Sequence, residues 1–157
     1  MKSTVYIETS IISYLVARPS NDIRAAAFQN ITADWWDNRR TDFDLYISEI
    51  VVAEASRGHP DAANRRLATI AGIVELRISA NARDLAKALI ASNSFPVKAG
   101  LDAFHVAVAA TNGIDYLLTW NCAHIANAVM RPRIDSMCRK LGFEPPIICT
   151  PAELLER

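Results

Sequence analysis

With 157 residues the chain is long enough to bury a sizeable core, and we expect residues 1–157 to form a single domain. Its 17 basic and 17 acidic residues give a formal net charge of zero, so composition provides no argument for a nucleic-acid partner. No apolar run approaches the ~20 residues that cross a bilayer, and "MKSTVYIETS" lacks the apolar stretch of a signal peptide, so we expect a cytoplasmic protein with no membrane partner.

The first half of the chain alternates short apolar runs with helical patterns. The predicted elements are a strand at Val5–Ile7, helices at Ser10–Ala17 and Asp22–Arg39, a strand at 43–48, and helices at Glu49–Arg57 and Pro60–Ala71. Ser48 is placed to cap the helix that follows it, and Gly58 to end that helix. The buried stripe of the second helix is predicted from apolar residues at helical spacing, namely Ile23, Ala27, Phe28, Ile31 and Trp35.

The second half continues the alternation. The predicted elements are a strand at 72–79, a helix capped by Ser79 that runs to Ser92, a loop at 92–100, a helix at Leu101–Thr111, a strand at 114–119, a helix at Arg133–Leu141 and a strand at 146–150. Strands that alternate with helices predict an α/β protein with a parallel sheet covered on both faces. In such sheets binding sites form at the carboxyl ends of the strands.

One acidic residue directly follows the first predicted strand. Glu8 lies where the buried strand passes into a helix, and a buried carboxylate is costly unless it is paired, hydrogen-bonded or bound to a metal. Two interpretations are open. Glu8 lies at the rim while Thr9 or Ser10 caps the helix, or Glu8 is one wall of a metal site.

Three further polar residues lie on the same side of the predicted layout. They are Glu54 in the helix after the second strand, Asp102 at the start of an apolar helix, and Asn121 after the fourth strand. Each has a structural alternative: a solvated helix position, a first-turn acid favoured by the helix dipole, and a turn residue. Glu49 and Asp115 are interpreted as structural acids.

Carboxylates that meet in one pocket repel one another and stay ionised only if a cation balances them. A site made of oxygen ligands suits Mg²⁺ or Mn²⁺. Such an ion activates a water molecule and stabilises displacement at phosphorus, so the pattern indicates phosphodiester hydrolysis.

The ordered segments "VYIETSIISYL", "YISEIVVAEASRG", "LDAFHVAVAATNGIDYLLTWNCAHI" and "IICTPAELL" resemble the PIN-domain family, and in particular the VapC-type toxin ribonucleases of toxin–antitoxin systems. This resemblance implies a three-layer α/β/α sandwich with a parallel sheet of about five strands. It also implies a Mg²⁺- or Mn²⁺-dependent endoribonuclease that cleaves RNA, is restrained by an antitoxin protein and forms a homodimer.

The resemblance assigns metal binding and catalysis to Glu8, Glu54, Asp102 and Asn121. Two of these depart from the family pattern, because the first and fourth positions are normally Asp. The extra methylene of Glu8 moves its carboxylate by ~1.5 Å, and Asn121 removes one negative charge, which favours one ion over two. These departures motivate an alternative function, a catalytically weakened PIN-like domain that acts by binding RNA or a protein partner.

Further residues have two interpretations each. Thr119 hydrogen-bonds a carboxylate or a phosphate, or only packs at a strand end, and His105 orients Asp102 or is a packed core histidine. Trp36 is left outside the apolar stripe, where it anchors an interface or is covered by the chain itself. Neighbouring arginines such as Arg65 and Arg66 bind phosphate or form surface salt bridges.

Overall fold

Five parallel strands form one sheet in the computed structural model, which describes residues 1–156. The strand order is β3-β2-β1-β4-β5. The strands are β1 (Thr4–Ile7), β2 (Asp44–Ser48), β3 (Val74–Leu76), β4 (Tyr116–Leu118) and β5 (Ile147–Cys149), and every neighbouring pair is parallel. Each overlaps a predicted strand, so the predicted parallel sheet is confirmed.

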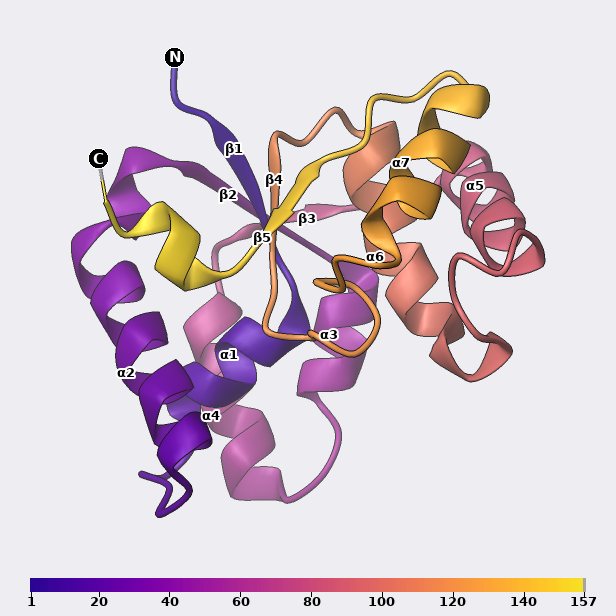
Figure 1. Cartoon of the computed structure of the whole chain (residues 1–157). Coiled ribbons are helices and arrows are strands. Elements are labelled where there is room, and N and C mark those ends of the chain that lie inside the picture. The colour runs from indigo at the N-terminus through magenta and orange to yellow at the C-terminus, as the bar shows by residue number, and fades with distance from the viewer. Residues whose placement is uncertain (157) are drawn as a thin grey trace.

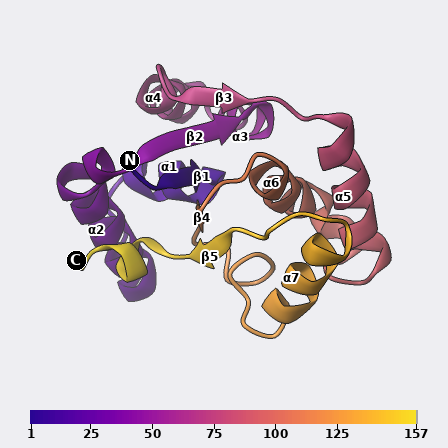
Figure 2. The same ribbon diagram turned by 90° about the horizontal axis from the view of Figure 1, so that it is seen from above.

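Helices cover both faces of this sheet. They are α1 (Thr9–Val16), α2 (Ile23–Asn38), α3 (Glu49–Ala55), α4 (Pro60–Ile70), α5 (Ala80–Ala91), α6 (Gly100–Thr111) and α7 (Arg131–Lys140), with short 3-10 turns η1 (Arg40–Asp42), η2 (Val97–Ala99) and η3 (Pro151–Leu154). Figures 1 and 2 show α1, α2 and α4 on one side of the sheet and α5, α6 and α7 on the other. The predicted three-layer α/β/α architecture is confirmed. Within residues 1–156, no helix is long and apolar enough to cross a membrane.

The core is centred on β1 and α6. Val5, Tyr6 and Ile7 of the central strand are fully buried, as expected for a strand with neighbours on both edges and helices on both faces. Residues 105–110 of α6 are buried on all sides, as its nearly continuous apolar sequence predicts. The carboxyl ends of β1 and β2 are followed directly by α1 and α3, and these junctions lie beside the packed core.

The buried stripe of α2 differs from the predicted one. Ile23 is 88% exposed and Ala27 is also exposed, whereas Thr32 and Trp35 are fully buried. Helical spacing identifies a face but not the turn at which that face first meets a partner, and here the packed part begins near Phe28. The helix ends agree better with prediction, since Ser48 caps α3 and Ser79 caps α5.

Other local expectations need correction. The segment predicted as the loop 92–100 contains the 3-10 turn η2, and α7 begins two residues before the predicted Arg133 because Pro132 fits the first turn of a helix. Trp36 is partly buried against the core, and the Arg40 guanidinium lies 4.9 Å from its ring centroid, so the chain itself covers much of this side chain.

One buried hydrogen bond joins α2 to the residue after β4. The indole N–H of Trp120 donates to the Thr32 hydroxyl at 2.7 Å, and the Trp120 ring stacks on Phe28 with 4.1 Å between centroids. Thr32 is fully buried and Trp120 is 8% exposed, so water does not replace this bond. The contact fixes the chain immediately before Asn121.

We expect Thr32→Val to lower the free energy of unfolding by about 1–3 kcal/mol, because it leaves the buried Trp120 indole N–H without an acceptor. The measurement is urea unfolding followed by fluorescence. Thr69→Val is the matched control. The hydroxyls of Thr32 and Thr69 each donate to the backbone carbonyl four residues earlier, but Thr69 lies near the surface. An equal loss in both variants would contradict the assigned role of the Trp120 bond.

Candidate functional site

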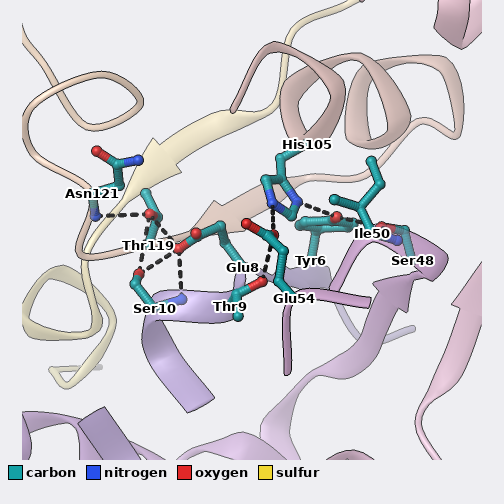
Figure 3. Close-up of polar contacts among 10 residues, drawn as sticks. All are labelled: Tyr6, Glu8, Thr9, Ser10, Ser48, Ile50, Glu54, His105, Thr119 and Asn121. Carbon is teal, nitrogen blue, oxygen red and sulfur yellow. Dashed lines mark hydrogen bonds and ion pairs between the residues drawn. The ribbon is translucent and has the colours of Figure 1, made fainter. Parts of the chain in front are cut away.

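Glu8 lies at the carboxyl end of β1 and is 5% exposed. Its Oε2 accepts hydrogen bonds from the Ser10 backbone N–H at 3.0 Å, from the Ser10 hydroxyl, and from the Thr119 hydroxyl at 2.9 Å. Figure 3 shows these three donors converging on one carboxylate oxygen. Glu8 is therefore itself the N-cap of α1, so the interpretation in which Thr9 or Ser10 caps this helix is wrong.

Thr119 links the ends of β1 and β4. Its backbone N–H donates to the Cys149 carbonyl at 3.0 Å and continues the sheet, while its hydroxyl donates to Glu8. The same hydroxyl oxygen accepts the Asn121 backbone N–H at 2.9 Å (Figure 3). Of the two interpretations of Thr119, the hydrogen bond to a carboxylate is present.

Glu54 projects from α3 toward β1 and α6, and its side chain is 23% exposed. Its Oε1 accepts hydrogen bonds from His105 Nε2 at 2.6 Å and from the Thr9 hydroxyl at 2.8 Å. Burial raises the pKa of Glu54, but the hydrogen bond and positive charge of His105 outweigh burial and hold the pKa below its ordinary value. Glu54 is thus an ionised, anchored carboxylate and not a solvated helix residue.

His105 lies on α6 and is fully buried. Its Nδ1 is 2.6 Å from the Tyr6 hydroxyl, and its Nε2 contacts Glu54. Of the two interpretations of His105, the one in which it orients Asp102 is wrong, because both ring nitrogens contact other residues, whereas its full burial agrees with a core histidine. Burial lowers the pKa of His105, but the hydrogen bond to Glu54 and the charges of nearby carboxylates raise it above its usual value.

Asp102 stands in the first turn of α6 and is half-buried. Burial raises its pKa; the charge of Glu8 adds to this rise, whereas His105 and the side-chain amide of Asn121 oppose it. The negative charge of Glu8 reaches Asp102, and the negative charges of Glu8, Glu54 and Asp102 all act on His105. The three predicted acids therefore share His105 as an electrostatic neighbour, and Glu8 also acts on Asp102.

Asn121 belongs to the same region. Its Oδ1 accepts the His124 backbone N–H at 3.2 Å, as in a turn, and its amide favours the charged form of Asp102. Asp115 and Glu49 are the two acids that we interpreted as structural. Asp115 accepts the Thr4 backbone N–H at 2.8 Å at the opposite end of the strands, and Glu49 lies exposed in the first turn of α3.

The donor set has the chemistry that a hard cation prefers. Glu8 Oε1 and Glu54 Oε2 receive no hydrogen bond from the described residues, so each glutamate has one anchored oxygen and one uncommitted oxygen. Oxygen ligands of this kind suit Mg²⁺ or Mn²⁺. In the described part of the chain, however, no group of three or more His, Cys, Asp or Glu is gathered closely enough to hold an ion.

The hydrogen-bonding residues around these acids were largely not predicted. The Tyr6 hydroxyl contacts both His105 and Ser48, while Ser10 holds Glu8 and Thr9 holds Glu54. One signal was available, because Tyr6 lies in the middle of a buried strand and a buried tyrosine hydroxyl needs a partner. The partners themselves lie on other elements and could not be named from the sequence.

Comparisons with known proteins agree with this architecture. VapC20 from Mycobacterium tuberculosis, described as a sarcin–ricin loop cleaving toxin, matches with a TM-score of 0.59 and 17% identity over 79% of this chain and 95% of that chain. VapBC2 from Rickettsia felis, solved bound to a DNA fragment of its promoter, matches with a TM-score of 0.54 and 15% identity over 94% of this chain and 98% of that chain. At these identities the likeness shows the fold alone.

No curated protein sequence matches the chain significantly. A family model does match, namely that of the PIN domain, over residues 5–121. That range is more than half of the chain and includes all four polar positions at the carboxyl edge of the sheet. The chain therefore belongs to the PIN domain family.

Proposed function

We propose that the protein is a metal-dependent endoribonuclease in which Glu8, Glu54 and Asp102 hold Mg²⁺ or Mn²⁺, with Asn121 contributing directly or through water. The observation that carries this proposal is the arrangement of the two glutamates. Each has one oxygen fixed by protein donors and one left uncommitted at the edge of the sheet where parallel α/β proteins bind ligands.

When bound, the ion lowers the pKa of a coordinated water and balances charge on the scissile phosphate. The chain's own residues have separate tasks. Thr119 and Ser10 hold Glu8, while His105 and Thr9 hold Glu54, so both carboxylates keep a fixed orientation. We assign proton acceptance from the attacking water to the Asp102 carboxylate, because each glutamate already has one oxygen fixed by protein donors.

A basic groove at the far end of α1 supports RNA as the substrate. It has a volume of about 440 Å³ and includes Arg18, Arg65 and Arg66 in its lining. Arg66 is held by the backbone carbonyls of Ala55, at 3.0 Å, and Arg57. The eight residues of α1 span about 12 Å, so this groove lies a few nucleotides from Glu8 along a strand of RNA.

We further propose that the protein is the toxin of a toxin–antitoxin pair, with an antitoxin protein as partner, that it forms a homodimer and that it acts in the cytoplasm. The fold it shares with VapC20 and VapBC2 supports the first of these assignments. An antitoxin that covers the carboxyl edge of the sheet would block access of RNA to Glu8, Glu54 and Asp102.

A second candidate function is favoured by a specific observation. The acids are already stabilised by protein groups, namely His105 for Glu54 and Thr119 with Ser10 for Glu8, and they are not gathered around a point in the described chain. A domain that had lost cleavage and acted by binding RNA or a protein partner would keep such an arrangement. The absence of the fourth negative charge at Asn121 points in the same direction.

We expect Asp102→Asn to reduce Mn²⁺ affinity by roughly tenfold or more and to abolish RNA cleavage, because it removes a charged ligand and the proposed base. Calorimetric titration and a cleavage assay on the same samples measure both effects. Asp84→Asn, on the exposed face of α5, is the control and should change neither.

Cleavage that persists in Asp102→Asn would remove Asp102 from the mechanism. A wild-type protein that binds RNA but neither binds Mn²⁺ nor cleaves would favour the second candidate function.

Asn121→Asp should strengthen Mn²⁺ binding, because a fourth carboxylate joins the coupled acids. Without metal the added charge repels Asp102, so we expect a lower melting temperature in chelator and a larger rise on adding Mn²⁺ than in the wild type. Thermal unfolding with and without Mn²⁺ measures both changes. Asn127→Asp, in the loop after β4, serves as the control, and an equal response of the two variants would contradict the assignment of Asn121 to the site.

The combined variant Arg18→Ser, Arg65→Ser should weaken RNA binding and reduce its dependence on salt, by about 0.7 in the log–log slope for each phosphate that the arginines no longer neutralise. Mn²⁺ affinity should stay unchanged because the groove lies away from the acids. Binding is measured at several salt concentrations, with Arg83→Ser, Arg133→Ser on α5 and α7 as the control. An unchanged salt slope would show that RNA does not use this groove.

A further inference from the structure

We propose that Ser48, Tyr6 and His105 form a buried hydrogen-bond chain that positions Glu54, so that His105 is a positioning residue for the metal-binding carboxylate and not merely a packed core histidine. This inference rests on the proposed metal-dependent function. It also makes a statement about Glu54 that holds without metal, namely that the orientation of its carboxylate depends on the hydrogen bonds that connect Ser48, Tyr6 and His105.

The contacts that carry the proposal are short and continuous. The Ser48 hydroxyl is 2.7 Å from the Tyr6 hydroxyl, which is 2.6 Å from His105 Nδ1, and His105 Nε2 is 2.6 Å from Glu54 Oε1. Figure 3 shows the four side chains in one row, coming from the end of β2, from β1, from α6 and from α3. Ser48, Tyr6 and His105 are completely buried, so water does not provide alternative partners.

The chemistry of the Glu54 end fixes the donor there. An ionised Glu54 only accepts, so His105 Nε2–H is the donor to Glu54, and the Ile50 backbone N–H donates to the Ser48 hydroxyl oxygen at 3.2 Å. With a neutral ring, Ser48 donates to Tyr6 and Tyr6 donates to His105 Nδ1; with a protonated ring, Nδ1–H donates to Tyr6 and Tyr6 donates to Ser48. Burial raises the pKa of Tyr6, so its hydroxyl keeps the proton that it donates.

The role of His105 does not depend on its charge. Both the neutral ring in this arrangement and the imidazolium donate through Nε2 to Glu54. The neighbouring Thr9 hydroxyl donates to the same Oε1, and together the two donors leave Oε2 uncommitted. A glutamate side chain has several rotatable bonds, so without these anchors Glu54 would adopt other rotamers and lose this orientation.

The ring of a core histidine also fills space, and a side chain that only filled space would affect the stability of the fold alone. A positioning residue additionally changes the affinity for metal, because removing the partner of a ligand typically costs 10–100-fold in metal affinity. Two variants separate these roles. His105→Gln and His105→Leu are both uncharged, but only Gln keeps an N–H donor at a similar reach.

The first measurement is calorimetric titration of Mn²⁺ into the intact protein. We expect His105→Leu to bind Mn²⁺ at least about tenfold more weakly than His105→Gln, whereas the two should unfold at more similar temperatures. Because both variants lack the ring's positive charge, the comparison isolates the donor. Equal Mn²⁺ affinities in the two variants would overturn the proposal.

Tyr6→Phe extends the test to the middle of the chain and covers the case in which His105→Leu does not fold. It removes only the hydroxyl between Ser48 and His105, so we expect a several-fold weaker Mn²⁺ affinity. Tyr116→Phe on neighbouring β4 is the matched control, because the Tyr116 hydroxyl makes no hydrogen bond with the described residues. Equal Mn²⁺ affinities of Tyr6→Phe and Tyr116→Phe would contradict the proposal that the hydrogen-bond chain positions Glu54.

The second measurement uses the metal-free protein and separates this inference from the proposed function. The Nε2 proton of His105, observed by ¹H–¹⁵N NMR, should be protected from exchange in the wild type and lose that protection in Glu54→Ala. If the wild type binds no Mn²⁺, the metal-dependent function fails and this spectrum decides the positioning. A ring proton unaffected by Glu54→Ala overturns the proposal, and one that loses protection supports it.

Discussion

The structure depends on accommodating two acidic side chains, Glu8 and Glu54, at the buried carboxyl end of the central strand. Glu8 is nearly inaccessible, and Glu54 is about three-quarters buried, so each needs donors that replace water. Thr119 and Ser10 satisfy one oxygen of Glu8, and His105 with Thr9 satisfies one oxygen of Glu54. These donors come from β4, α1 and α6, and therefore the packing of these elements around β1 determines where the charges lie.

The departures from the family pattern fit this constraint. The longer side chain of Glu8 reaches forward to the Ser10 amide and sideways to Thr119, so the carboxylate serves as a helix cap and a strand link at once. His105 adds a buried group whose pKa is raised by the surrounding acids, and it thereby reduces their mutual repulsion. With Asn121 uncharged, fewer negative charges need balancing at this edge of the sheet.

The parts of the fold that follow from local sequence were predictable. The apolar runs gave the strands, Ser48 and Ser79 marked helix starts, and a nearly continuous apolar pattern indicated that α6 is buried. The strand–helix alternation also placed Glu8 and Asn121 at strand ends. Tertiary partners were not predictable in this way, because spacing along α6 suggested His105 with Asp102, whereas the approach of α3 and β1 gives its ring to Glu54 and Tyr6.

The three acids differ in how firmly the protein holds them. Glu8 is tied to α1 and to the end of β4, and Ser10 also accepts the Trp120 backbone N–H at 2.8 Å, which connects this cap to the packing of Trp120 on α2. Glu54 ends a chain that begins at the Ile50 amide. Asp102 is half-buried, and burial raises its pKa, whereas His105 holds the pKa of Glu54 below its ordinary value. The two glutamates therefore form a frame that the protein's own donors fix, and Asp102 lies beside this frame with its charge opposed by burial.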